Sequence, residues 1–280
     1  MKHDWKTSLK LVGWFLYAVV IGLVMVPYLR PLVGAGVGGL KEGVLIAVVL
    51  LALVVLGAFF WLRLMRYRFE KVIAVAYAMT VGTAFWMLVE MMADWRVALF
   101  VFFFVWFVQY EIIGVLRREG RGELFQIALL LNNMFQGLMV GMVGAMVGIT
   151  VAPWVAMFIL FLLAVYDAWM VWKSGKMIEL ANGLVKRGVL PVFAVLKKES
   201  GNLAMIGGGD AFCVIMVGAS FLRWMSVWST VSAVVGMLFG LLYLIFFGRK
   251  DVSYPALPFI FLGLFAGWFG GLAIRSAIIG

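Results

Sequence analysis

The sequence predicts an all-α membrane protein, a bundle of nine transmembrane helices. Three observations predict this fold class: 66% of the 280 residues are apolar, only 13% are charged, and the mean hydropathy is +1.11. Soluble domains carry about 25% charged residues, so a soluble fold is excluded. In a membrane chain, a formal charge of +10 indicates cytosolic loops rather than nucleic-acid binding. We therefore expect a multi-pass protein of the cell membrane.

Nine stretches are long and apolar enough to cross a bilayer, since a span needs about 20 mainly apolar residues. They are 11–29, 43–62, 72–92, 95–116, 124–150, 153–173, 203–221, 227–247 and 255–276. Of the 23 Lys and Arg residues, 18 fall in the N-terminal tail or after an even-numbered segment. The positive-inside rule therefore predicts that the N-terminus is cytosolic and the C-terminus extracytosolic.

We expect one polytopic domain over residues 1–280, with no separate soluble unit. Helices one to six occupy 1–173, a cytosolic connection 174–202, and helices seven to nine 203–280. Within the connection, residues 177–187 mix apolar and charged side chains at helical spacing, which predicts a helix along the membrane interface. Residues 189–196 are too short to span the membrane and are expected to be extended.

Two aspartates interrupt apolar spans: Asp167 in segment six and Asp210 in segment seven. A carboxylate at the centre of a bilayer costs about 2.5–3.5 kcal/mol, so such residues are rare and usually functional. At about 1.5 Å rise per residue, Asp167 lies roughly 9 Å from Lys173 and Asp210 roughly 10 Å from Leu203, the two cytosolic ends. The matching depths predict that the two carboxyl groups face each other across adjacent helices.

A facing pair of carboxyl groups is suited to amide hydrolysis. Because two like charges held close together do not both ionise easily, such a pair shares one proton. One carboxylate then takes a proton from water while the protonated partner hydrogen-bonds the scissile carbonyl, without metal or cofactor. His3, the only histidine, lies in a polar tail, which argues against a histidine-based metal site. Gly207, Gly208 and Gly209 let a substrate backbone approach the second aspartate closely.

Three motifs together resemble the presenilin and signal peptide peptidase family of GxGD intramembrane aspartyl proteases. They are Tyr166-Asp167 in the sixth span, Gly207-Gly208-Gly209-Asp210 in the seventh and Pro255-Ala256-Leu257 in the ninth. The resemblance implies that the two aspartates are the catalytic dyad and that the Pro-Ala-Leu motif shapes the floor of the active site. Tyr166 either orients Asp167 by hydrogen bonding or is a core or interfacial tyrosine.

The resemblance also implies that the substrates are single transmembrane helices of membrane proteins or signal-peptide remnants. Hydrolysis requires a helix to unwind, and its freed backbone groups need partners in a nonpolar setting. We expect strand edges at Leu203, Ala204, Met205 and Ile206, and before Pro255, to supply them. The short loops resemble a compact archaeal member of the family that acts without obligatory partner subunits.

Two other interpretations of the aspartate pair stay open. A prepilin-peptidase-type aspartyl protease shares the Gly-x-Gly-Asp motif, but it is not expected to carry Pro-Ala-Leu in a ninth span. A transporter coupled to protons or cations would use two membrane aspartates as ion sites, although no inverted repeat is visible.

Segment five carries further polar and small residues that are expected to pack helices together. Asn132, Asn133 and Gln136 are expected to form interhelical hydrogen bonds rather than substrate contacts. A close-packing face is predicted at Gly137, Gly141, Gly144 and Gly148.

Overall fold

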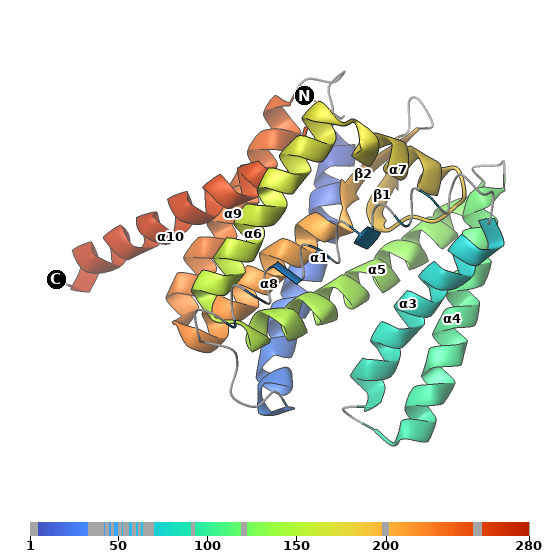
Figure 1. The fold of residues 1–280 in the computed structure, drawn as a ribbon, viewed down its shortest axis with the longest axis horizontal. Coiled ribbons are helices and arrows are strands. Elements are labelled where there is room, and N and C mark those ends of the chain that lie inside the picture. The colour runs from blue at the N-terminus through green and yellow to red at the C-terminus, as the bar shows by residue number, and fades with distance from the viewer. Residues whose placement is uncertain are drawn as a thin grey trace.

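The computed structural model describes residues 5–32, 70–90, 93–118, 122–197, 202–248 and 254–279, together with isolated positions between 42 and 63. The described chain is a bundle of helices with one short two-stranded hairpin (Figure 1). The second span predicted from the sequence, 43–62, falls largely outside these residues.

The long helices follow the predicted spans. They are α1 (Trp5–Leu29), α3 (Glu70–Glu90), α4 (Trp95–Arg117), α5 (Glu123–Thr150), α6 (Pro153–Ala168), α8 (Gly208–Trp224), α9 (Val227–Phe247) and α10 (Leu257–Ile279). In the described ranges, seven helices are long and apolar enough to cross a membrane; α8, with 17 residues, is not among them. The helical membrane fold is confirmed, whereas the count of nine spans and the sidedness of the termini stay predictions.

The glycines of α5 bring this helix into close contact with α1 and α8. A Cβ atom at Gly141 would lie 3.1 Å from the carbonyl oxygen of Ala18, and one at Gly144 would lie 3.2 Å from that of Phe212. Larger side chains would push the helices apart, so small residues permit this approach. The close-packing face predicted for segment five is confirmed.

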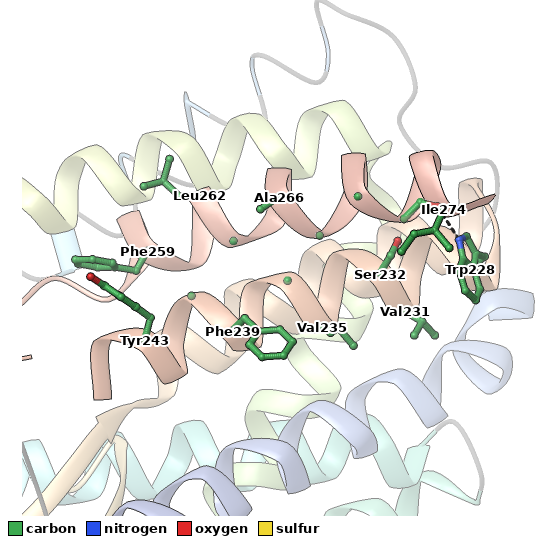
Figure 2. Close-up of a pocket in the computed structure, with 16 residues that line it drawn as sticks. Trp228, Val231, Ser232, Val235, Phe239, Tyr243, Phe259, Leu262, Ala266 and Ile274 are labelled. Atoms are coloured by element: carbon green, nitrogen blue, oxygen red, sulfur yellow. Dashed lines mark hydrogen bonds between the residues drawn. The ribbon is translucent and has the colours of Figure 1, made fainter. Parts of the chain in front are cut away.

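Helices α9 and α10 also meet through small residues. A Cβ atom at Gly236 would lie 2.6 Å from the Cα atom of Gly267, and Trp228 Nε1 donates a hydrogen bond to the carbonyl oxygen of Gly271 at 3.0 Å (Figure 2). An apolar groove of about 820 Å³ runs along this contact and contains neither membrane aspartate. Beyond the contact, α10 extends away from the rest of the bundle (Figure 1).

The hairpin lies directly before α8. Strands β1 (Val192–Leu196) and β2 (Leu203–Gly207) pair antiparallel, which confirms the extended conformation expected at the end of the connection. The helix of segment seven begins only at Gly208, so its predicted start at residue 203 is wrong. The strand conformation expected for Leu203, Ala204, Met205 and Ile206 is confirmed. Three consecutive glycines favour a helix poorly, and the residues before them find hydrogen-bond partners in β1 instead.

Two further elements connect α6 to the hairpin. A π-helical turn, η2 (Trp169–Lys173), continues α6, and α7 (Lys176–Val185) follows, close to the helix expected at 177–187. Its position at the membrane interface stays a prediction. The N-terminus, α7 and the hairpin lie at the same end of the bundle (Figure 1).

Candidate active site

Asp167 lies in the last turn of α6, immediately before the π-helical turn. Its Oδ2 accepts a hydrogen bond from the main-chain N–H of Leu257, with 3.2 Å between the two atoms, and the backbone of Ala256 also interacts with it. The first N–H groups of a helix lack partners within that helix, and Leu257 is the first residue of α10. Asp167 therefore supplies a partner to the start of α10, and so places the Pro-Ala-Leu motif beside its carboxyl group.

Asp210 lies in the first turn of α8, three residues after the end of β2. Its carboxyl group interacts with the backbone of Gly207, and a Cβ atom at Gly207 would lie 2.9 Å from Asp210 Oδ2. The φ of Gly207 is −62° and its ψ 134°, an ordinary extended conformation. Glycine is therefore needed here for space and not for backbone freedom.

The two carboxyl groups come together although 43 positions separate them in the chain. Asp167 and Asp210 lie close enough for their charges to interact, and Cys213, one turn further along α8, interacts with both. Both aspartates are half-buried. Three segments singled out from the sequence thus meet at one place: the end of α6, the start of α8 and the start of α10.

Of the two alternatives for Tyr166, the hydrogen bond to Asp167 is not formed among the described residues. The Tyr166 hydroxyl group is buried and, among the residues that the structure describes, has no hydrogen-bond partner. Neighbouring residues on a helix point about 100° apart, so adjacency in sequence does not bring the Tyr166 hydroxyl to the carboxyl group of Asp167. A role for Tyr166 in supporting the site stays a prediction.

Polar side chains of α5 hold the hairpin in place. Asn133 donates from Nδ2 to the carbonyl oxygen of Ala194 at 2.8 Å and accepts at Oδ1 from the N–H of Ala194 at 3.0 Å. Asn132 donates from Nδ2 to the carbonyl oxygen of Leu190 at 3.1 Å. The sequence predicts that these amides form hydrogen bonds with other helices. Asn132 does so, because its Oδ1 accepts a hydrogen bond from Gln109 of α4. The backbone partners of Asn132 and Asn133, however, belong to β1 and the residues preceding it.

The register of the hairpin shows which backbone groups of β2 face outward. Gly208 N–H donates to the carbonyl oxygen of Pro191, and Lys197 N–H to that of Asn202, so even-numbered residues of β2 bond to β1. Consecutive residues of an antiparallel strand turn their backbone groups to opposite sides. Leu203, Met205 and Gly207 therefore turn theirs away from β1, whereas Ala204 and Ile206 pair within the hairpin.

One residue near the site was missed by sequence reasoning. Tyr77 of α3 is buried, and its hydroxyl group lies 2.8 Å from Gln136 Oε1 and 3.1 Å from the carbonyl oxygen of Leu190. A buried tyrosine usually has a polar partner. A tyrosine in the middle of an apolar span therefore indicates a buried hydrogen bond, and this pattern could have identified Tyr77. Which partner the hydroxyl group bonds to depends on how α3 packs against α5, and no local pattern indicates it.

Comparisons with known proteins show the family to which this chain belongs and solved structures with a similar fold. A family model described as signal-peptide peptidase, presenilin aspartyl protease matches residues 41–277. Two solved structures of a presenilin family intramembrane aspartate protease, in space groups C222 and P2, are similar to this chain at 22% and 23% sequence identity. Each has a TM-score of 0.63 and covers 97% of this chain and 100% of its own. Among curated proteins, no significant match was found.

Proposed function

The chain belongs to the signal-peptide peptidase and presenilin family of aspartyl proteases, and from this premise we propose that Asp167 and Asp210 form its catalytic dyad. It is an intramembrane protease and a multi-pass membrane protein. What supports the dyad is geometry: Asp167 at the end of α6 accepts a hydrogen bond from the start of α10, and Asp210 at the start of α8 lies close enough for the two charges to interact.

The chemistry follows from two carboxyl groups that share one proton. The ionised one removes a proton from water as the water oxygen attacks the scissile carbonyl carbon, while the protonated one donates a hydrogen bond to the carbonyl oxygen. The C–N bond of the resulting tetrahedral intermediate then breaks, and the amine leaves with a proton from the dyad. This reaction requires no metal and no cofactor.

The test is cleavage of a synthetic single-span peptide by the purified protein. We expect Asp167→Ala and Asp210→Ala each to reduce cleavage to background, because either change removes half of the acid–base pair. Glu111→Ala is the control, since Glu111 is an exposed acidic residue of α4 and its removal should leave cleavage intact. Cleavage that survives in either aspartate variant would exclude the dyad.

The proposed substrates of this protease are single transmembrane helices. A helix must unwind before its amides can be hydrolysed, and each freed N–H and C=O group needs a partner away from water. The outward backbone groups of Leu203, Met205 and Gly207 form a strand edge that leads to Asp210, and an unwound substrate segment can add to such an edge as a further strand. The residues before Pro255 are proposed as a second edge.

Substitutions of Leu257 test whether the Pro-Ala-Leu motif forms the floor of the active site. Leu257 is 9% exposed and its N–H bonds to Asp167, so Leu257→Glu places a second negative charge beside the dyad. We expect this variant to lose cleavage while its melting temperature stays near that of the parent. Leu257→Met keeps the size and apolar character and should retain cleavage. Normal cleavage by Leu257→Glu would count against a role of this motif at the site.

We also propose the complete topology: nine spans, a cytosolic N-terminus and no obligatory partner subunits. The uneven division of Lys and Arg between the two sides supports the sidedness. The family match over residues 41–277 does not favour the transporter or prepilin-peptidase interpretations.

A further inference from the structure

A cavity of about 530 Å³ lies beside the candidate active site, between α3, α5 and the start of α8. Gly208 and Gly209, the two residues before Asp210, form part of its wall, together with Pro191 and Gln136. A Cβ atom at Gly209 would meet nothing within 4 Å, so the chain is open to the cavity at this point. The cavity therefore adjoins the place where a substrate backbone would pass the dyad.

Gln136 is the unusual residue of this wall, because it is a polar side chain only 2% exposed whose donor is unused. Its Oε1 accepts the hydrogen bond from the Tyr77 hydroxyl group, which fixes the orientation of the amide. Its Nε2 lies against Gly208, where a Cβ atom would collide with it. No hydrogen bond from Nε2 to any described residue is present. Leaving a buried donor unpaired is unfavourable, so an acceptor supplied from outside the chain would be stabilised here.

The hydroxyl side chains described in the cavity wall are already engaged. The hydroxyl groups of Thr80 and Thr83 donate to the carbonyl oxygens of Ala76 and Met79 within α3, at 2.9 and 2.8 Å. The N–H of Gly208 donates to the carbonyl oxygen of Pro191. Within the described part of this wall, Gln136 Nε2 is thus the side-chain donor that remains available.

We propose that Gln136 binds the substrate, donating a hydrogen bond from Nε2 to a main-chain carbonyl of the unwound segment next to the scissile bond. This inference rests on the proposed function, since it assumes that an unwound segment passes the dyad. A carbonyl freed from a helix in an apolar cavity gains a partner that lipid does not offer. The lack of a side chain at Gly208 keeps Nε2 accessible, and the hydrogen bond from the Tyr77 hydroxyl group to Oε1 fixes the orientation of the amide.

The experiment compares Gln136→Met with Gln109→Met, using the same synthetic single-span peptide. Gln109 is also a buried amide of this polar network and donates to Asn132 at 3.1 Å, but it does not line the cavity. For Gln136→Met we expect KM to rise about three- to tenfold, the effect of one lost hydrogen bond, with kcat changed much less. For Gln109→Met we expect the KM of the parent, even if its melting temperature falls.

A KM for Gln136→Met within about twofold of the parent, or an equal rise in Gln109→Met, would overturn the proposal. If Gln136→Met does not fold, Gln136→Glu takes its place, because it keeps an oxygen for the Tyr77 hydroxyl group. The ratio of its KM to that of the parent should rise with pH, because the carboxyl group loses the proton that it donates in the hydrogen bond. A ratio that stays near one at every pH contradicts the proposal. A parent enzyme that cleaves nothing would instead refute the proposed function.

Discussion

At the scale of single residues, the candidate site requires free space beside the carboxyl groups as well as the groups themselves. Gly207 leaves room for the carboxyl group of Asp210, and a Cβ atom there would stand 2.9 Å from Oδ2. Asp167 is held from the other side by the first N–H of α10. Small local changes of volume should therefore act on the reaction before they act on the fold.

Gly207→Ala tests this steric requirement. Because the backbone of Gly207 is one that alanine adopts freely, the variant should fold and the added methyl group should displace the Asp210 carboxyl group. We expect kcat to fall about a hundredfold, the scale of an effect of misplacement by roughly 1 Å. Gly114→Ala is the matched comparison, since a Cβ atom at this position of α4 meets open space, and it should lose far less. Equal losses in the two variants would show that the space at Gly207 is unimportant.

The pH dependence of kcat tests whether the proposed dyad shares one proton. At low pH both carboxyl groups are protonated and no base remains; at high pH both are ionised and no acid remains. We therefore expect a bell-shaped profile whose two limbs belong to the pair rather than to either aspartate. A rate that stays constant from acid to alkaline pH would contradict acid–base catalysis by this pair.

At the scale of elements, the candidate active site is assembled from the ends of helices. Asp167 closes α6, Asp210 opens α8, and Leu257 opens α10. Helix ends carry backbone groups without partners, so they can bind one another and a substrate where the middle of a helix cannot. The position of α10 then matters for the proposed dyad, and the glycine contact with α9 is one of the contacts that hold α10 in place.

Gly236→Ala tests the link between this contact and the site. The added methyl group would meet the main chain of α10 at Gly267, and such overpacking costs about 1–3 kcal/mol. We expect a lower melting temperature and a lower rate of cleavage, because the start of α10 moves relative to Asp167. Gly270→Ala, a position on α10 with open space around it, should change neither. A stable Gly236→Ala protein with the rate of the parent would separate this contact from catalysis.

At the scale of the whole molecule, the elements around the site gather at one end of the bundle. The N-terminus, α7 and the hairpin lie together there (Figure 1), and the excess of Lys and Arg falls in the segments assigned to the same side. The proposed cytosolic position of the N-terminus therefore also assigns α7 and the hairpin to the cytosolic end.

Cysteine labelling in intact cells tests the sidedness. The chain has one native cysteine, Cys213, which is buried, so an introduced cysteine gives the main signal for an impermeant reagent. We expect Ser276→Cys to be labelled from outside and Lys6→Cys only after the membrane is permeabilised. The opposite pattern would reverse the proposed topology.

The sequence by itself determined the membrane fold class, most of the helices and the residues of the candidate site. These are local properties: apolar length defines a span, and a carboxylate in an apolar run is conspicuous wherever it lies. Even so, one local expectation failed: the helix of segment seven does not begin at residue 203, because residues 203–207 form a strand. Of the two alternatives for Tyr166, the hydrogen bond to Asp167 is not seen among the described residues.

Only the tertiary structure decided which groups meet. The strand at 203–207 exists because β1 pairs with it and Asn133 holds β1 from α5, a partnership between residues about 60 positions apart that no local pattern encodes. The same is true of Leu257 and Asp167, and of Gln136, whose unused donor becomes visible only beside Gly208. Hydrogen bonds between distant segments depend on how the helices pack, and packing is a property of the whole bundle rather than of any one stretch.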